Sequence, residues 1–361
     1  MDKQKNKTKD YHRFEEYTKE HQYDSKQQKV TVRFATMKAM LNAAWSIVDL
    51  YDYMDKNHLI YAGNPKQTLW FHPLTGHINL RDTMHFVDVN DKLEEQMEYS
   101  ELTPPEVIRS NSGSYTRDGQ NWSLAVLLFE FFYHSDGPYK GIACAMQPFT
   151  DSQEEYRWMA EYGVFNMDKK VHDNRPIPGV QDSLMKYWDI FPMVLQDAFM
   201  KTFVEGKENP ENRLTALEWK KIINQLQTDY IECQCGYKNF IIKFGKNENG
   251  HWCCPKCKKI YYIFSNGENE IYLTTDTVIK RNQLYPVQSD NGENIGMVVE
   301  NTRQKGLFGI KNISDEIWTG LYPDNVQKPI EPGGGIPIWQ GLEITLPNGQ
   351  QWAIQGDGNG K

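Results

Sequence analysis

The stretch that most limits how this chain can fold is Trp122–Tyr133, WSLAVLLFEFFY, which is apolar on almost every side of a helix. A helix at the surface of a domain has an apolar stripe and a polar face, so a helix without a polar face must be surrounded by other elements. Its most apolar part, Leu124–Tyr133, contains Glu130 and is far shorter than the roughly 20 residues that span a membrane. We therefore expect a helix through the middle of a helical domain.

The surrounding helices that this arrangement needs are visible in the sequence. Val32–Lys56 places its apolar residues mostly three and four positions apart, which is typical of an amphipathic helix. Three more helices are predicted downstream, at Ser183–Trp188, Pro192–Glu205 and Thr215–Gln227. The last of these begins with a capping box formed by Thr215 and Glu218. We expect a mainly helical domain at residues 30–229, preceded by a partly disordered segment at residues 1–29.

A hairpin is predicted between the first of these helices and the central one, within Leu59–Asp82. An apolar strand at Thr68–Phe71 is followed by a tight turn at His72–Gly76 and a second strand at His77–Leu80. The second strand ends close to Asp82, which places a carboxylate where it could meet a metal ion.

The composition changes at about Tyr230, where a cluster of cysteines begins. Five of the six cysteines lie between Cys233 and Cys257, and the N-terminus has no secretion signal, so metal binding is favoured over disulfides. We predict a structural zinc ribbon at residues 230–270, because four protein ligands leave no open position for catalysis. Zinc is favoured over free thiols. The predicted ligands are Cys233, Cys235, Cys254 and Cys257, with Cys253 as the spare thiol.

From Tyr272 onward the helical pattern gives way to short strands between turns rich in Gly, Pro, Asn and Asp, which predicts a β-sandwich at residues 271–361. The expected strands are Met297–Val299, Gly306–Lys311, Gln327–Ile330, Ile336–Ile338, Glu343–Leu346 and Trp352–Ile354. The tail GDGNGK is expected to fray. The predicted fold class is therefore multidomain: a mainly helical domain, a small β ribbon and an all-β sandwich.

Charge and hydropathy narrow the possible partners and location. Lys and Arg number 40 against 48 Asp and Glu, which leaves a net charge of −8 and no basic stripe, so we expect no nucleic-acid partner. No apolar run reaches transmembrane length and no signal peptide is visible, so we expect no membrane association and a cytoplasmic location.

The helical part resembles the C-terminal lobe of a protein kinase. Its matching stretches are Leu59–Asp82 for the catalytic and magnesium loops, Thr103–Glu106 for the Ala-Pro-Glu motif, Asn121–Glu130 for the central helix, His134–Tyr139 for the Gly-x-Pro turn, and Asn209–Trp219 for the segment before the last helix. The resemblance implies a structural ion pair between Glu106 and Arg213. More closely, the chain resembles bacterial serine/threonine kinase-like proteins with an appended zinc ribbon and a forkhead-associated-like domain.

The same resemblance implies that phosphoryl-transfer activity is lost. Phosphoryl transfer needs a catalytic Asp, an Asn and an Asp that hold magnesium. The catalytic Asp position is Gly63 and the Asn position is Thr68, which leaves Asp82 as the one residue able to bind magnesium. The N-lobe with its Gly-rich loop also has no counterpart in the roughly thirty residues before Val32. We therefore expect a degenerate C-lobe without its N-lobe, which disfavours ATP and magnesium as cofactors.

The end of the chain resembles the second half of a forkhead-associated domain, in Gly309–Thr319, Ile330–Gly333 and Gly341–Ile344. Such domains bind phosphothreonine through an Arg after a Gly and a Ser before an Arg-x-His turn, and neither is found here. Protein docking is therefore the expected role of this domain, with a role in stability as the alternative.

These observations favour a catalytically inactive pseudokinase that acts as a scaffold or regulator in a bacterial signalling, stress-response or defence system. The resemblance implies a metal-dependent phosphatase, a von Willebrand A-type protein or a kinase as partner. One alternative is a serine/threonine kinase that is completed by a partner chain or works with non-standard residues. Another is a purely structural adaptor.

Overall fold

The computed structural model describes residues 11–18, 22–23, 29–30, 32–90, 99–110, 116–248, 250–275, 277–285, 292–304, 307–322 and 324–355. The chain divides into two compact units, Met1–Ile223 and Asn224–Lys361, and each is considered by itself. The first ten residues and the C-terminal tail, both predicted to be poorly ordered, lie outside the described residues. The predicted division into four parts stays a prediction.

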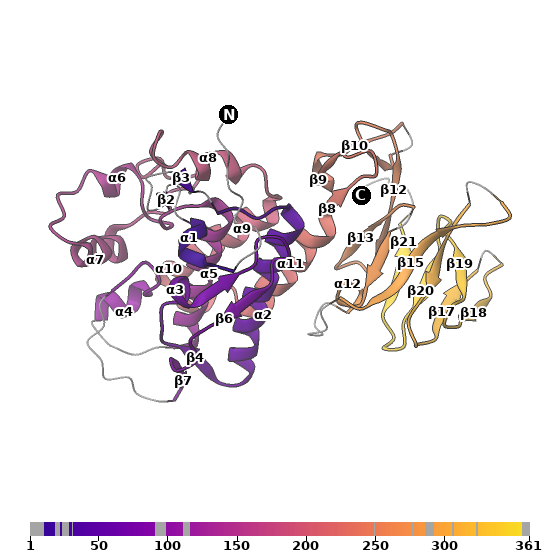
Figure 1. Ribbon diagram of the computed structural model, residues 1–361, viewed down its shortest axis with the longest axis horizontal. Coiled ribbons are helices and arrows are strands. Elements are labelled where there is room, and N and C mark those ends of the chain that lie inside the picture. Colours follow the sequence, from indigo (N-terminus) through magenta and orange to yellow (C-terminus); the bar gives the residue numbers. More distant parts are fainter. Residues whose placement is uncertain are drawn as a thin grey trace. The chain divides into compact units, whose positions relative to one another are not determined.

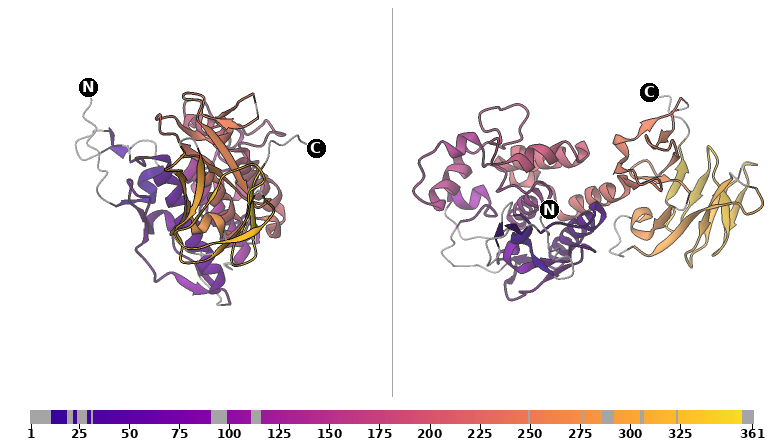
Figure 2. Two further views of the ribbon diagram at one scale, coloured as in Figure 1. Left: turned by 90° about the vertical axis from the view of Figure 1, so that its right-hand side faces the viewer. Right: turned by 45° about the horizontal axis from the view of Figure 1, so that its top comes forward.

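The central helix of the first unit is α5 (Arg117–Tyr133), which begins where the Thr116 side chain accepts a hydrogen bond from the Gly119 amide at 3.0 Å. All its residues from Leu124 to Tyr133 are buried. It packs against α1 (Phe14–Thr18), α2 (Met37–Lys56) and α8 (Asp182–Trp188), and Figures 1 and 2 show helices around it. Neighbouring helices thus cover α5 on several sides, as its lack of a polar face requires.

The other helices of the first unit differ from the prediction in extent and number. α2 begins at Met37 rather than Val32, because the Thr36 side chain caps it by accepting from the Ala39 amide at 3.1 Å. The predicted helix Pro192–Glu205 is α9 (Met193–Met200) followed by a π-helical turn, Lys201–Glu205. The remaining helices are α4 (Pro105–Ser110), α6 (Ile142–Ala145), α7 (Ser152–Tyr162), α10 (Gly206–Glu208) and α11 (Ala216–Asp229), of which only α11 was predicted.

Residues near the N-terminus complete the core of the first unit. Phe14 and Tyr17 on α1 are 0% and 2% exposed, and both rings contact the Phe131 ring on α5. The preceding strand β1 (His12–Arg13) pairs with β5 (Leu69–Phe71), a strand of the hairpin. A second short hairpin joins β2 (Gln22–Tyr23) to β3 (Lys29–Val30).

The hairpin predicted within Leu59–Asp82 is present. This region consists of β4 (Leu59–Tyr61), the one-turn helix α3 (Pro65–Thr68), β5 (Leu69–Phe71), β6 (Ile78–Leu80) and β7 (Phe86–Asp88). β5 pairs with β6, and β4 pairs with β7. The turn needs glycine at Gly76, where φ is +76° and a Cβ would lie 1.9 Å from the Ala39 carbonyl oxygen. The hairpin therefore lies directly against the first turn of α2.

The cysteine-containing part of the second unit is a pair of hairpins. Its elements are β8 (Tyr230–Glu232), β9 (Lys238–Phe240), β10 (Gly245–Lys246), β11 (Trp252–Cys253), β12 (Ile260–Ser265) and β13 (Glu270–Leu273). β8 pairs with β9 and β11 pairs with β12. β12 then continues into pairing with β13 and with the last strand of the chain. One strand therefore belongs both to the ribbon and to the sandwich, which the sequence treats as successive domains.

Two sheets and a short helix make up the rest of the second unit. One sheet has the order β14 (Val278–Lys280), β15 (Asn294–Glu300), β16 (Phe308–Asn312), β19 (Gly335–Pro337). The other continues from β12 through β21 (Gln351–Ile354), β20 (Glu343–Thr345), β17 (Trp318–Leu321) and β18 (Gln327–Ile330). α12 (Arg281–Leu284) follows β14. Trp318 and Trp352 are 1% and 0% exposed and lie in the core of this unit.

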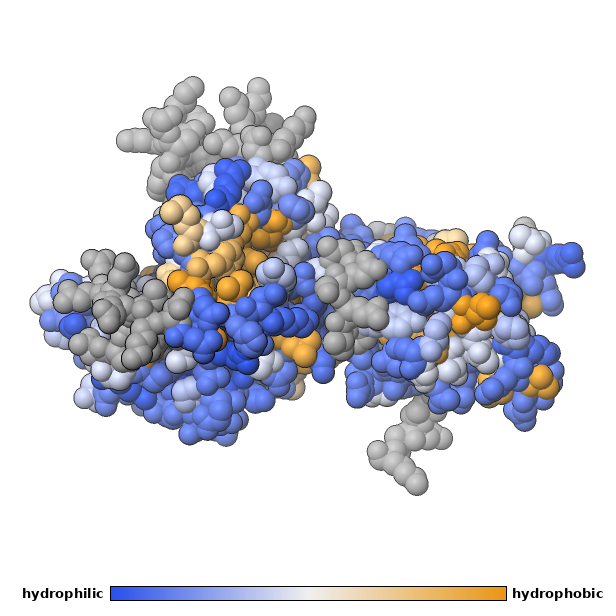
Figure 3. All heavy atoms as spheres, turned by 90° about the horizontal axis from the view of Figure 1, so that it is seen from below, coloured by the Kyte–Doolittle hydropathy of each residue, from blue (hydrophilic) through white to orange (hydrophobic). Residues whose placement is uncertain are grey.

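The described helices include none that is both long enough and apolar enough to cross a bilayer. The face seen in Figure 3 is largely hydrophilic, with apolar residues gathered over one area of the first unit.

The burial of α5 predicts the effect of truncating one of its side chains. Leu128→Ala removes a fully buried side chain, 0% exposed, and should lower the free energy of unfolding of the first unit by about 2–5 kcal/mol. Urea unfolding followed by tryptophan fluorescence measures this loss. Met84→Ala is the control, because Met84 is 90% exposed and its truncation should change stability by less than about 0.5 kcal/mol. Equal effects of the two substitutions would contradict the central position of α5.

Candidate functional site

The residue at the predicted Asn position, Thr68, is held by its own loop. Its hydroxyl donates to the Asn64 carbonyl oxygen at 3.0 Å and lies 2.8 Å from the Tyr61 hydroxyl. The Tyr61 hydroxyl is also 3.2 Å from the Asp82 carbonyl oxygen. Tyr61 therefore links the end of β4, the end of α3 and the segment after β6, and burial raises its pKa so that it stays neutral.

Gly63, which the resemblance places at the catalytic Asp position, lies close to two side chains. A Cβ there would lie 2.8 Å from the Tyr61 hydroxyl oxygen and 2.9 Å from Cδ2 of His85. Both distances are shorter than real Cβ contacts. A residue other than glycine at this position would therefore require the Tyr61 and His85 side chains to shift.

Both carboxylate oxygens of Asp82 contact residues that are close in sequence. Its Oδ1 accepts a hydrogen bond from the Met84 amide at 3.0 Å, and its Oδ2 lies 3.3 Å from Nε2 of His85. Asp82 does not belong to the only group of three or more potential metal ligands found in the described part of the chain. Asp82 thus lies beside His85 and is not part of a cluster of potential metal ligands among the described residues.

A cavity of about 280 Å³ opens beside Gly63. No charged side chain is among the residues that line it: Tyr51, Ile60, Tyr61, Ala62, Gly63, Asn64, Tyr99, Ser100, Leu102, Thr103, Pro104, Gly119, Gln120 and Ser123. The triphosphate of a nucleotide and its metal are held in proteins by cations and carboxylates. The described residues of its wall offer only neutral groups.

A buried charged cluster lies next to this loop. Nζ of Lys66, on α3, forms ion pairs with Glu101 and, at 2.9 Å, with Oε2 of Glu130 on α5. Burial raises the pKa of Glu130 to about 7, although Lys66 acts in the opposite direction. Burial lowers the pKa of Lys66, but Glu130 and Glu101 outweigh it and raise that pKa overall. Tyr156 donates to Glu101 at 3.0 Å, so the cluster joins four separate segments of the first unit.

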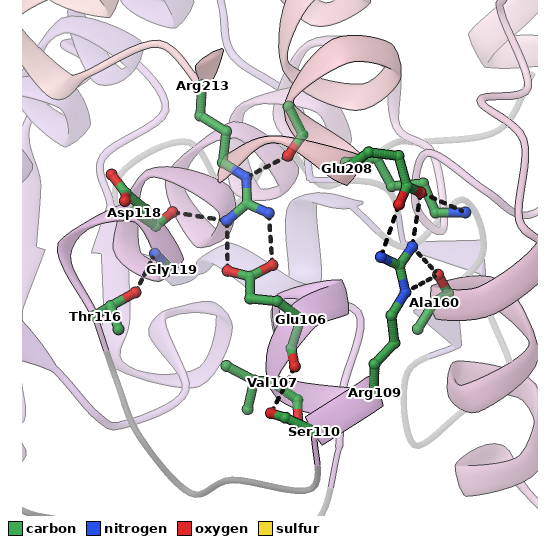
Figure 4. A network of polar contacts seen from close by, with 12 residues as sticks. Glu106, Val107, Arg109, Ser110, Thr116, Asp118, Gly119, Ala160, Glu208 and Arg213 are labelled. Atoms are coloured by element: carbon green, nitrogen blue, oxygen red, sulfur yellow. Dashed lines mark hydrogen bonds and ion pairs between the residues drawn. The ribbon is translucent and has the colours of Figure 1, made fainter. Parts of the chain in front are cut away.

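Glu106 and Arg213, which the resemblance paired, are brought together by the structure (Figure 4). Nη1 and Nη2 of Arg213 donate to the two carboxylate oxygens of Glu106 at 2.8 and 2.6 Å. Arg213 also donates to the carbonyl oxygens of Asp118 at 3.0 Å and Gly206 at 2.7 Å, and its guanidinium lies 4.9 Å from the Trp122 ring. The Arg213 side chain is 0% exposed, so this pair is part of the fold.

The four predicted metal ligands lie together in the second unit. The Sγ atoms of Cys233, Cys235, Cys254 and Cys257 are all within 4.8 Å of one another. Two pairs of sulfurs are 3.5 and 3.6 Å apart, which is close to the edge of about 3.8 Å in a tetrahedron with metal–sulfur bonds of about 2.3 Å. None of the six cysteines is in a disulfide. The cluster could therefore hold a metal ion such as zinc.

Two tight turns bring these sulfurs together. The first follows β8, where the Cys233 amide donates to the Tyr237 carbonyl oxygen at 2.8 Å and Gly236 has a φ of +85°. The second follows β11, where the Cys254 amide donates to the Lys259 carbonyl oxygen at 2.9 Å. Cys253 lies in β11 and is outside the cluster.

The sequence interpretation missed several residues of the loop region, namely Tyr61, Lys66, His85, Glu101 and Glu130. One signal was available: Glu130 is the only charged residue in Trp122–Tyr133, and a charge on such a helix needs a buried partner. The position of that partner, Lys66, depends on tertiary packing. The contact of Tyr61 and His85 with the space at Gly63 likewise has no sequence pattern.

No protein-family model matches this chain, and no curated protein matches it. Among solved structures, it is similar to ROP2 from Toxoplasma gondii, described as a virulence factor with a protein-kinase fold and no enzymatic activity. The TM-score is 0.34 and the sequence identity 13%, over 50% of this chain and 41% of ROP2. The match thus spans less than half of the length of that structure.

The cysteine cluster predicts a clear difference between two neighbouring thiols. The purified protein should contain one Zn²⁺ per chain, and Cys254→Ser should lose it, because a serine hydroxyl does not replace a thiolate ligand. Cys253→Ser is the matched control, since Cys253 is also buried but lies outside the cluster, and it should keep its zinc. Elemental analysis of the two variants measures both outcomes. Zinc retained in Cys254→Ser would contradict the assignment.

The buried carboxyl of Glu130 predicts a pH dependence of stability. In the folded protein its pKa is raised to about 7 from 4.5, so it binds a proton that the unfolded chain has already released. The stability it contributes is full below pH 4.5 and is lost as the pH rises through 7. Glu130→Gln removes this loss. Between these pH values, the stability of the variant relative to the native protein should rise by roughly 1–3 kcal/mol.

Urea unfolding at a series of pH values measures this difference. Glu205→Gln is the control, because Glu205 is exposed, and its curve should run parallel to that of the native protein. A Glu130→Gln curve that is also parallel would mean that Glu130 keeps its ordinary titration.

Proposed function

We propose that this chain is a pseudokinase: a protein-kinase-like C-lobe without phosphotransfer activity, carried with a zinc ribbon and a forkhead-associated-like sandwich, which acts by binding other proteins. The observation that carries this proposal is the space at Gly63. A phosphotransferase needs a carboxylate at this position to orient the attacking hydroxyl; glycine supplies none, and the side chains of Tyr61 and His85 pack against it.

Two further features support the absence of phosphotransfer. Thr68 stands at the position of the magnesium-binding Asn, and its hydroxyl is hydrogen-bonded to the Asn64 carbonyl oxygen and to the Tyr61 hydroxyl. The described residues that line the cavity beside the loop carry no charge, so none of them would neutralise a triphosphate. The β5–β6 hairpin and the Glu106–Arg213 ion pair, which the resemblance to a kinase C-lobe implies, are nevertheless present.

A scaffold role agrees with the surface of the first unit. Several large apolar side chains are well exposed there, among them Met84 at 90%, Met146 at 77% and Met193 at 59%. Methionine adapts its shape to different partners and is frequent at binding surfaces. We propose a metal-dependent phosphatase, a von Willebrand A-type protein or a kinase as the partner, in a bacterial cytoplasmic signalling system. The zinc ion, in this proposal, has a structural role.

The proposal predicts no ATP turnover. With ATP and magnesium, the native protein should transfer labelled phosphate to a general protein substrate no faster than Asp82→Ala, because no carboxylate is available at Gly63. The measurement is a labelled-phosphate assay, with a thermal shift on the same samples to detect nucleotide binding. Turnover that is abolished in Asp82→Ala would overturn the pseudokinase proposal and favour a kinase with non-standard residues.

A further inference from the structure

A second cavity in the first unit has a different chemistry from the one beside Gly63. It measures about 180 Å³ and lies between α1, the start of α2, the end of α5 and the segment at the end of α8. Most of its wall is apolar or aromatic: Tyr17, Phe34, Met37, Met40, Phe132, Tyr187 and Phe191. Thr36, Arg33 and His134 complete it. We refer to it as the aromatic cavity.

Among the described residues of this wall, Arg33 is the one with a charged side chain, and hydrogen bonds hold it in position. Nη1 donates to the carbonyl oxygens of Tyr17 at 3.2 Å and Val32 at 3.0 Å, and the guanidinium lies 5.8 Å from the Tyr17 ring. No carboxylate of a described residue forms an ion pair with Arg33, and none is among the lining residues. A fixed guanidinium without a carboxylate, at the wall of an apolar cavity, is suited to bind an anion with an apolar body.

His134 adds a neutral polar group to the same wall. Its Nδ1 lies 3.2 Å from the Tyr17 carbonyl oxygen, which can only accept, so Nδ1 carries the hydrogen and Nε2 is left as an acceptor. Burial, aided by Arg33, lowers the pKa of His134 to about 3, so the ring is uncharged at neutral pH. The backbone of His134 is left-handed, with a φ of 50°, because His134 is the residue that ends α5, so the end of this helix sets the position of the ring.

We propose that the aromatic cavity binds a small apolar carboxylate, with its ring or short alkyl chain among the aromatic residues and its carboxylate on Arg33. The apolar wall excludes sugars and nucleotides, whose polar groups would lose water without finding partners. The single guanidinium distinguishes a carboxylate from the neutral amide of the same shape. This inference does not depend on the pseudokinase proposal, because the cavity shares no lining residue with the one beside Gly63.

Methionine methyl NMR on the full chain tests the proposal with 3-phenylpropionate as the probe. Met37 and Met40 line the cavity, and the other eleven of the thirteen methionines serve as internal controls. Single substitutions of Met37 and Met40 by leucine assign the two signals. Titration should move these two methyl signals with a saturable curve and leave the others in place. 3-Phenylpropionamide, which has no charge, should bind at least about tenfold more weakly.

Arg33→Gln separates the role of the charge from that of the apolar wall. It should weaken 3-phenylpropionate binding by about tenfold and leave the binding of the amide unchanged. Arg175→Gln is the matched control, because Arg175 is an exposed arginine outside the cavity, and it should change neither. Equal affinity of the native protein for the two probes would overturn the proposal, as would the absence of saturable shifts at Met37 and Met40. These two outcomes need no variant, so they hold even if Arg33→Gln fails to fold.

Discussion

The buried guanidinium of Arg213 holds together parts of the first unit that lie far apart in the sequence. It neutralises Glu106 at the start of α4 and donates to carbonyl oxygens near the start of α5 and in α10. A charge with no exposure is tolerated only when its hydrogen bonds are made inside the protein. The chain around residue 106, the first turn of α5 and the approach to α11 are therefore fixed relative to one another.

Much of the fold was predictable because it depends on local patterns. The apolar run that becomes α5, the capping box at Thr215 and Glu218, the hairpin with its turn at Gly76 and the four clustered thiols each leave a clear pattern in the sequence. The helices α4, α6 and α7 were missed. α4 and α6 are only one or two turns long, and few residues of α7 are buried. Their stability comes from packing, which no short window of sequence contains.

The candidate sites divide in the same way. Ligand identity at the cysteine cluster follows from residue type and spacing, because the turns that carry the thiols are themselves local. The side chains around Gly63 do not, because Tyr61 comes from the end of β4 and His85 from the turn before β7, and these strands are paired by tertiary structure. Arg33 was missed for a related reason: the sequence places it inside the predicted helix Val32–Lys56, whereas α2 begins only at Met37, and its cavity is formed by four separate segments.

The strand β12 has a consequence for how the second unit unfolds. It pairs with β11, which leads into the second pair of cysteines, and also with β13 and β21 of the sandwich. A strand shared by two sheets cannot be lost from one of them alone, so the ribbon and the sandwich should melt as a single cooperative body. Any metal ion on the thiols then contributes its binding free energy to the whole of that body. The buried tryptophans of β17 and β21, strands that carry no cysteine, would therefore respond when a chelator removes the metal ion.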